Sequence, residues 1–493
     1  MIFNSIDYLL FFPVVVCLYF LMPKRLKNLW LLVVSYYFYM QWNMKYALLL
    51  AGSTFITYAG GLFIERFRSK GKEAPAKACL GITFALNLLI LFFFKYINFA
   101  IDNINRLAGA VNVEVNLTHF DILLPVGISF YIFQALSYSM DVYRGEIKAT
   151  RNILKYALFV SFFPQLVAGP IERSKNLLGQ FDREHKFNVE NARKGLLMMA
   201  WGLFMKMVIA DNIALTVDMV FGNYNGFSGI EIILAAVLFA IQIYCDFGGY
   251  SLIAIGSARI LDFRLMENFK SPYYAASISQ FWKRWHISLT SWFRDYLYIP
   301  LGGNRKGKIR KYINVFLIFF VSGMWHGAAW NYIVWGAMNG ILMIVEELTA
   351  GFRKKLRGRF SVDTGRFSYR LAARLLTFAL VDFTWLFFRA DSMGTAFLMI
   401  KKCFDYLAPE RIAGLAFVSM GMDTRTAVIL LLSILLLFLV DGMKYKGIDV
   451  AEFVFSQGAW LRYVIYAGLL FGILFFGVYG NLYEQTQFIY FQF

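Results

Sequence analysis

Long apolar blocks recur along this chain, and they constrain its fold more than any other feature of the sequence. Each block is roughly 16 to 25 residues long, the length of a helix that crosses a hydrocarbon core of about 30 Å. Hydrophobic residues make up 59% of the chain and charged residues only 16%, whereas soluble domains are about 45–50% apolar and about 25% charged. One globular core cannot hide this apolar excess, so we expect an integral membrane protein.

The spans are predicted to be helices. Backbone polar groups in lipid must be satisfied within a helix or a closed barrel, and barrel strands alternate between polar and apolar side chains. The run 429–440 does not alternate. The sequence therefore predicts an all-α, polytopic transmembrane protein with about 11–13 spanning or re-entrant helices. The predicted spans are 6–22, 28–42, 46–64, 78–98, 122–142, 194–210, 230–257, 312–324, 329–348, 372–390, 426–442 and 461–479. The short stretch 156–170 contains two prolines and is predicted to be re-entrant.

The formal net charge of +18 would suit either nucleic-acid binding or a membrane protein. Lys and Arg lie in short loops between the apolar blocks, as expected for cytoplasmic loops near anionic headgroups, and no nucleic-acid-binding motif accompanies them. The second and fourth loops are not basic, so the N-terminus is predicted outside and the odd-numbered loops in the cytoplasm. The basic loops carry Lys24, Arg25 and Lys27; Arg66, Arg68, Lys70, Lys72 and Lys77; and Arg144, Lys148, Arg151 and Lys155.

No polar stretch is long enough to build a separate soluble core, so residues 1–493 are predicted to form one membrane domain. Within it, the segment 264–311 is rich in aromatic and basic residues and has no spanning run. Trp282, Trp285, Leu289 and Trp292 recur at helical spacing and predict one aromatic stripe on a helix. This helix is either an interfacial amphipathic anchor or the wall of a pocket whose basic groups bind an anionic acyl carrier.

His326 lies between two apolar blocks, in the stretch 322–331. An ionisable side chain at membrane depth is costly and is a functional candidate by default. A neutral imidazole can accept a proton near neutral pH. The alternative is a structural role for His326, as a hydrogen-bonded histidine in the core.

His286, on the aromatic segment, is by spacing alone either structural or a partner of His326 in proton transfer. Asp246 is a carboxylate inside an apolar block, and either orients a histidine or pairs with an arginine. Asp382 and Arg389 lie together in another block and are predicted to pair with each other. His119 and His185 lie in polar loops and are predicted to be solvated.

Other chemistries lack a sequence signature. The four cysteines form no C-x-x-C pair, and neither His286 nor His326 has a second histidine three or four residues later, so no metal site is predicted. Neither a G-x-S-x-G nucleophile elbow nor a Walker A motif occurs.

Several motifs together resemble the membrane-bound O-acyltransferase family, in the branch of the alginate O-acetyltransferase membrane subunit. The similar segments are Phe163–Pro170, Met266–Tyr273, Phe281–Leu289 with Trp292–Asn304, Trp325-His326-Gly327 and Phe488–Phe493. One motif departs from the family pattern D-F-S-G-Y-S-D, because Gly248 replaces a serine and Leu252 replaces an aspartate. Roles that rest on those two side chains cannot be carried over.

The resemblance implies that His326 is the principal catalytic histidine and His286 its partner. It also implies a central tunnel through a thinned membrane region. Substrate binding is predicted for Arg284, Trp285, Arg294, Asp295, Asp246, Trp325 and Asn331.

The function expected from the resemblance is transfer of an acetyl group from a cytoplasmic thioester, acetyl-CoA, to an extracytoplasmic polysaccharide or peptidoglycan. Expected partners are a secreted or membrane-anchored acetyltransferase of the SGNH type, or the polysaccharide itself, and an acyl carrier protein is an alternative donor. The expected location is the bacterial cytoplasmic membrane. Alternatives are D-alanyl transfer to teichoic acid, a membrane transporter, and a structural subunit that docks a secreted acetyltransferase.

Overall fold

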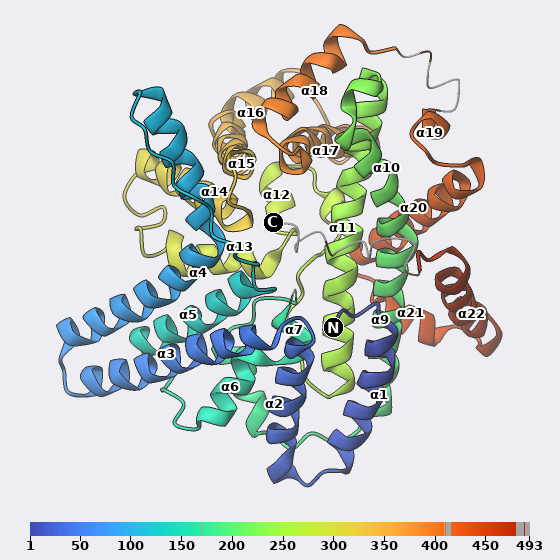
Figure 1. Cartoon of the computed structure of the whole chain (residues 1–493). Helices are drawn as coiled ribbons and strands as arrows, with labels where there is room; N and C mark the ends of the chain where they lie inside the picture. The colour runs from blue at the N-terminus through green and yellow to red at the C-terminus, as the bar shows by residue number, and fades with distance from the viewer. Residues whose placement is uncertain (168, 409, 411–415, 480–487, 489–493) are drawn as a thin grey trace. The chain divides into compact units, whose positions relative to one another are not determined.

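The computed structural model describes residues 1–493 except for 168, 409, 411–415, 480–487 and 489–493. Every regular element among the described residues is a helix (Figure 1), which confirms the all-α prediction. Internal contacts divide the chain into two compact units, of which unit 1 contains Met1–Leu196 and Ala254–Met266, and unit 2 contains Leu197–Ile253 and Glu267–Phe493. The boundaries between the units fall within helices α9 and α11 and just after residue 266.

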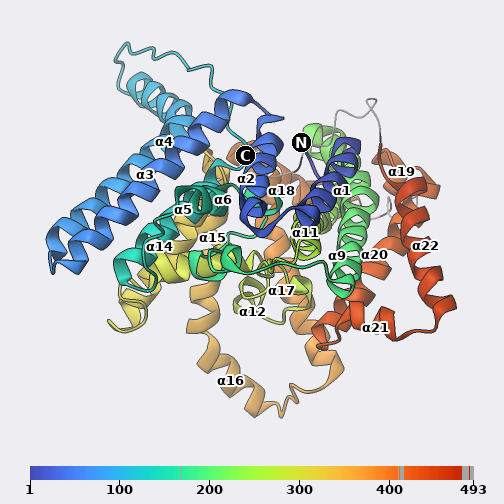
Figure 2. The same ribbon diagram turned by 90° about the horizontal axis from the view of Figure 1, so that it is seen from below.

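Unit 1 is built around a hairpin of two long helices, α3 and α4, which lie side by side (Figure 1 and Figure 2) and pack on α5. Polar bonds join these apolar helices, for example Ser53 Oγ to Asn87 Oδ1 at 2.6 Å. The helices of this unit are α1 Ile6–Leu21, α2 Lys24–Met40, α3 Met44–Ser69, α4 Glu73–Ala110, α5 Ile128–Arg144, α6 Ile153–Ser161, α7 Phe163–Leu166, α8 Ser174–Leu177, the 3₁₀ turn η1 Gln180–Asp182 and the start of α9 Val189–Leu203. As predicted, neither α6 nor α7 is long enough for a full crossing.

His185, in unit 1, is buried and not solvated, so this prediction was wrong. Its ring stacks near Phe263, with centroids 4.2 Å apart, and only 5% of the residue is exposed. Nδ1 lies 3.1 Å from Asp262 Oδ2, and Nε2 lies 2.8 Å from the carbonyl oxygen of Gln180. The charged neighbours of His185 in the sequence hid this burial. His119 is exposed, as predicted, and lies 2.8 Å from Asp102.

Unit 2 has a core of tryptophan and phenylalanine rings. Trp335 stacks on Trp385 with ring centroids 5.4 Å apart, and both pack against Phe388. Its helices are the π-helical turn η2 Phe204–Ala210, α10 Asp211–Gly222, η3 Tyr224–Gly226, α11 Gly229–Ile260, η4 Pro272–Tyr274, α12 Ile278–Trp282, α13 Ile287–Phe293, the π-helical turn η5 Arg294–Tyr298, α14 Lys308–His326, α15 Trp330–Leu348, α16 Ala350–Arg359, α17 Phe367–Arg389, α18 Met393–Asp405, α19 Ala416–Ser419, α20 Thr424–Tyr445, α21 Val450–Ser456 and α22 Ala459–Phe476.

Each of the twelve predicted spans overlaps helical structure, although 122–127 precede α5 and 194–210 covers the end of α9 and η2. Seven helical segments in the described chain are long and apolar enough to cross a membrane, or eight if α15 and α16, bent by 47°, form one span. The others fall short because α1, α2 and α5 have only 16 or 17 residues, and α14 begins with three basic residues among its first four. The chain is a multi-pass membrane protein.

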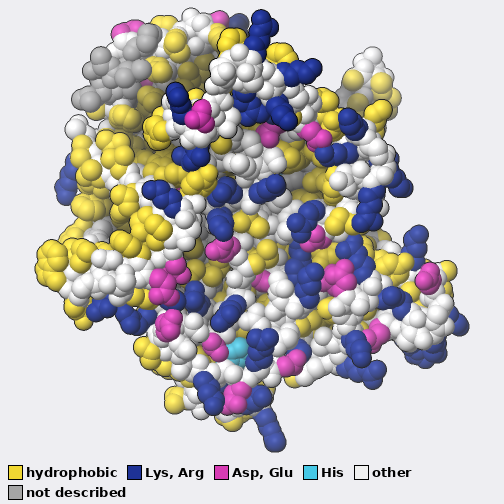
Figure 3. All heavy atoms as spheres, turned by 180° about the vertical axis from the view of Figure 1, so that it is seen from behind, with side chains coloured by type: hydrophobic (Ala, Val, Ile, Leu, Met, Phe, Trp, Pro, Cys, Tyr) yellow, Lys and Arg dark blue, Asp and Glu magenta, His cyan; other side chains and the backbone are white. Residues whose placement is uncertain are grey.

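Apolar side chains are exposed on these helices, as lipid contact requires. In α22 only Gly472 and Ile473 are buried, and the apolar window of α20 is 28% buried. Figure 3 shows the resulting exposed hydrophobic side chains with Lys and Arg between them. A soluble surface would not carry so many exposed large apolar residues on its longest helices.

Candidate active site

The predicted continuous helix through Trp282 and Trp292 is wrong, because the backbone breaks at His286. Helix α12 ends at Trp282 and α13 begins at Ile287. His286 has φ +43°, a left-handed conformation that costs a non-glycine residue about 1–3 kcal/mol. The aromatic side chains Trp282, Trp285 and Trp292 are buried on both sides of the break.

Asn268 holds the His286 ring. Asn268 Oδ1 lies 3.0 Å from His286 Nδ1 and 2.8 Å from Ser288 Oγ. The Ser288 N–H also donates to Oδ1, at 3.3 Å, and Asn268 Nδ2 donates to Ser251 Oγ at 3.1 Å. Because a backbone N–H can only donate, Oδ1 is an acceptor, and His286 Nδ1 therefore carries the hydrogen. In the neutral ring the lone pair is then on Nε2.

The His286 ring is neutral at physiological pH. It is almost completely buried, and the rings of Phe247 and Phe269 pack against it. Burial lowers the pKa of His286 to about 3, because an apolar surrounding disfavours the charged imidazolium.

His326 is placed by the close packing of α14 on α15. A Cβ at Gly323 would lie 2.4 Å from the carbonyl oxygen of Tyr332, and one at Gly336 would lie 2.3 Å from that of Phe319. Only glycine lets the two helix backbones approach so closely. The approach brings the last residue of α14, His326, against the edge of Trp335, at 4.9 Å between ring centroids.

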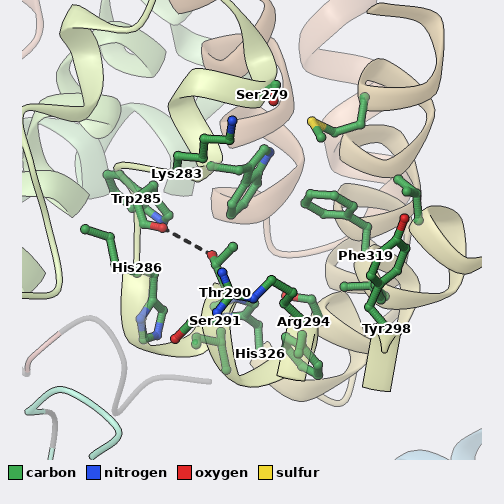
Figure 4. A pocket seen from close by; sticks show the side chains of 18 residues that line it. Ser279, Lys283, Trp285, His286, Thr290, Ser291, Arg294, Tyr298, Phe319 and His326 are labelled. Atoms are coloured by element: carbon green, nitrogen blue, oxygen red, sulfur yellow. Dashed lines mark hydrogen bonds between the residues drawn. The ribbon is translucent and has the colours of Figure 1, made fainter. Parts of the chain in front are cut away.

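Both histidines line one cavity of about 340 Å³ in unit 2 (Figure 4). Most of its wall is apolar, from α12, α13, α14 and α15. Trp325 lies against both imidazoles, with its ring centroid 5.9 Å from that of His286 and 4.9 Å from that of His326. The polar and basic side chains of the wall are Ser279, Lys283, Thr290, Ser291, Arg294, Tyr298 and Ser322.

Two of the residues predicted to bind substrate line this cavity. Trp285 is fully buried and packs on Phe269 and Trp385 at 5.0 and 5.1 Å. Arg294 lines the cavity and forms an ion pair with Asp295, whose Oδ1 lies 2.9 Å from Arg294 Nε.

Arg284 and Asn331 make other contacts. Arg284 donates to the carbonyl oxygen of Lys270 at 2.9 Å, and its guanidinium lies over the Tyr445 ring at 4.8 Å. Asn331 donates to the carbonyl oxygen of Ala390 at 2.8 Å, which ties α15 to the end of α17. These two contacts support the walls of the site.

Asp246 belongs to a buried ion triad. Lys206 Nζ lies 2.6 Å from Asp246 Oδ1 and 2.8 Å from Asp211 Oδ1, and all three side chains are about 3% exposed. The sequence pointed to a histidine or an arginine as partner and missed Lys206. The available signal was a lysine inside an apolar block, which is itself unusual at membrane depth.

The predicted pair of Asp382 with Arg389 was wrong. Arg389 Nη2 lies 2.5 Å from Asp218 Oδ1, and Nη1 lies 3.7 Å from Asp391 Oδ1. Two residues seven positions apart on one helix are separated by about 10 Å along its axis, too far for a direct ion pair.

Sequence reasoning also missed Asn268, the residue that holds the His286 ring. It lies in the motif Met266–Tyr273, but nothing in its spacing pointed to His286. Of the C-terminal motif, Phe488 packs on Tyr250 at 4.6 Å, while 489–493 lie outside the described residues, as does Ala168 in the motif 163–170. Within the described parts of the chain, no group of three or more His, Cys, Asp or Glu side chains is arranged to hold a metal ion.

The helices and the cavity define a multi-pass membrane protein with two buried imidazoles on one candidate active site. Comparison with known proteins identifies the family. The sequence profile of MBOAT, the membrane-bound O-acyltransferase family, matches residues 145–365. The chain is 41% identical to the probable alginate O-acetylase AlgI of Pseudomonas putida, over 82% of this chain and 81% of that protein. This chain therefore belongs to the membrane-bound O-acyltransferase family and is an O-acyltransferase.

Two further relatives have different names. The peptidoglycan O-acetyltransferase of Helicobacter pylori is 35% identical over 79% of this chain and 77% of its own length. The teichoic acid D-alanyltransferase of Bacillus subtilis is 27% identical over 47% of this chain and 61% of its own length. The profile match includes α12 to α15, and therefore both histidines.

Proposed function

We propose that this protein transfers acetyl groups from a cytoplasmic thioester, acetyl-CoA, to hydroxyl groups of an extracytoplasmic cell-envelope polysaccharide, either an alginate-like polymer or peptidoglycan. The observation that carries the proposal is the cavity that both His286 and His326 line. The relatives at 41% and 35% identity are named for O-acetylation, whereas the D-alanyltransferase is more distant, and this order favours acetyl over D-alanyl transfer.

His326 is the general base in this proposal. The acceptor hydroxyl oxygen attacks the thioester carbonyl carbon, the C–S bond breaks, and the hydroxyl proton passes through His326 to the departing thiolate. His286 is a weak base, because burial lowers its pKa to about 3. Its Nε2 lone pair instead accepts a hydrogen bond from the hydroxyl and orients it, as Asn268 fixes the tautomer.

The cavity also suits an anionic thioester donor. Lys283 and Arg294 lie on its wall together with hydroxyl groups from Thr290, Ser291 and Ser322. Cations in a mostly apolar wall attract phosphate groups more strongly than cations in water do. The apolar remainder accommodates a small acyl group and excludes water that would hydrolyse the thioester.

Release of the product on the outer side completes the proposal. The acceptor is reached directly or through a secreted or membrane-anchored acetyltransferase of the SGNH type, and the protein resides in the bacterial cytoplasmic membrane. A transmembrane tunnel from the donor side to the acceptor side is required by this route.

The experiment compares a deletion strain complemented with wild type, His326→Ala or His119→Ala. We expect wild type and the exposed control His119→Ala to restore envelope O-acetyl groups, and His326→Ala to restore none at equal membrane abundance. In proteoliposomes, wild type should release thiol from acetyl-CoA and not use a D-alanyl carrier protein. Full O-acetylation by His326→Ala would contradict the proposal, and D-alanyl transfer would replace its substrate.

A further inference from the structure

A second cavity, of about 270 Å³, lies in unit 1 and is unrelated to the acyl-transfer residues. Its walls come from the end of α1, the first turn of α2 and the loop that follows η1. The basic side chains on these walls are Lys24, Arg25, Lys27, Arg183 and the buried His185.

The cavity carries an excess of positive charge. Lys24, Arg25 and Arg183 are exposed at its wall. One carboxylate, Asp182, also lines it, but its Oδ2 is bound by Lys155 Nζ at 2.6 Å. The first turn of α2 has no side-chain cap on its N–H groups, and the partial positive charge of a helix N-terminus adds to that of the side chains.

A buried hydroxyl provides independent support for a ligand. Tyr19 lines the cavity and is fully buried, and its hydroxyl has no hydrogen-bond partner among the described residues. Buried polar groups in native proteins are normally paired with protein or with something bound.

Lys27 is held at the wall rather than free to leave it. Its ammonium lies 5.0 Å from the centroid of the Tyr19 ring and donates to the carbonyl oxygen of His185 at 2.7 Å. An ammonium has three hydrogens, so two remain for a ligand. The cavity therefore offers a fixed donor, Lys27, as well as exposed cations.

We infer that this cavity binds a phosphate group. Arginine forks, ammonium groups and a tyrosine hydroxyl match the several acceptor oxygens of a phosphate. The group is either the headgroup phosphate of an anionic phospholipid or that of a soluble phosphate compound. The predicted cytoplasmic position of the loop with Lys24 and Arg25 makes both sources accessible, since anionic lipids are enriched on that side.

The test uses the full chain in detergent and the variants Arg25→Gln/Arg183→Gln and Tyr19→Phe. The matched control, Lys70→Gln/Lys72→Gln, removes the same charge from exposed residues of unit 1 that do not line the cavity. Native mass spectrometry measures the binding of dioleoylphosphatidylglycerol, the lipid source. The melting temperature in inorganic phosphate, compared with that in chloride, measures the binding of a soluble phosphate.

For a lipid headgroup, we expect phosphatidylglycerol binding to weaken about 10-fold in the arginine variant and several-fold in Tyr19→Phe, with the control unchanged. For a soluble source, inorganic phosphate should raise the melting temperature of wild type and the control but not of the arginine variant. The inference is overturned if neither probe distinguishes wild type from the arginine variant, or if the control loses as much binding.

Discussion

Two buried histidines, His185 in unit 1 and His286 in unit 2, differ in the hydrogen bonds of their rings. This difference separates a structural histidine from a candidate for catalysis. Both are almost inaccessible and both pack on phenylalanine rings. The two ring nitrogens of His185 face two acceptors, Asp262 and the carbonyl of Gln180, which fix the ring as a structural link. The Nδ1 of His286 is held by Asn268, and its Nε2 keeps a lone pair at a cavity. His185 therefore links segments of unit 1, whereas the ring of His286 is fixed at Nδ1 and lines the cavity of the candidate active site.

The largest effect should come from contrasting His326→Ala with His185→Ala. A positioned base is worth about 10²–10⁴ in rate, so the purified His326→Ala protein should lose that factor in kcat with little change in melting temperature. His185→Ala should lose about 1–3 kcal/mol of stability from its buried hydrogen bonds but retain kcat. Thiol release from acetyl-CoA and thermal unfolding measure both. A normal rate in His326→Ala, or a larger rate loss in His185→Ala, would contradict a catalytic role for His326 and a structural role for His185.

Asn268 should matter next, as a positioning residue. Asn268→Leu removes the acceptor for His286 Nδ1–H, and a misplacement of about 1 Å in an active site can cost about 100-fold in rate. Asn268→Asp keeps an acceptor and should restore most of the rate. Its carboxylate favours the imidazolium, so its rate should begin to fall at a higher pH than that of wild type. A pH–rate profile of Asn268→Asp identical to that of wild type would show that this contact does not act through His286.

The packing of α14 on α15 gives a smaller, mainly structural effect. Gly336→Ala places a methyl group 2.3 Å from the carbonyl oxygen of Phe319, and the forced shift should cost about 1–3 kcal/mol. Since α14 ends at His326, kcat should fall as well. Gly351→Ala, at a glycine with no neighbouring atom within 4 Å, is the matched control. Unchanged melting temperature and kcat in Gly336→Ala would show that the helices can separate freely.

The smallest effect concerns pH. The pKa of His286 is lowered from 6.5 to about 3 in the folded protein, so the unfolded chain binds a proton that the native state does not. Stability from this group is complete above pH 6.5 and is lost progressively as the pH falls toward 3. The melting temperature of wild type should therefore fall more between pH 7.5 and about 5 than that of His286→Gln does. Equal losses in the two proteins would place the His286 pKa near its ordinary value.

The helices were predictable, whereas the contacts of the site were not. The lengths of the apolar blocks and the charges between them located twelve helices, because both properties can be read from the local sequence. The break at His286 depends on a strained backbone that the regular spacing of Trp282, Trp285 and Trp292 concealed. Partners such as Lys206 for Asp246 lie 40 residues away in the chain, and only the fold brings them together.

The placement of His326 and His286 on one cavity required the structure. The motifs pointed to both histidines, but the sequence alone left open a purely structural role for each. The glycines that let α14 approach α15, and the side chain of Asn268, decide where the two rings lie. Local propensity does not encode such contacts, since they depend on tertiary packing.

The most direct measurement of the central claim is a double-mutant cycle on acetyl-CoA turnover with His286→Gln and His326→Gln in proteoliposomes. If both imidazoles act on one hydroxyl in one cavity, their effects are strongly non-additive, and the double variant should be about as slow as His326→Gln alone. If the two rate losses multiply in full, the histidines act independently and the shared site is contradicted.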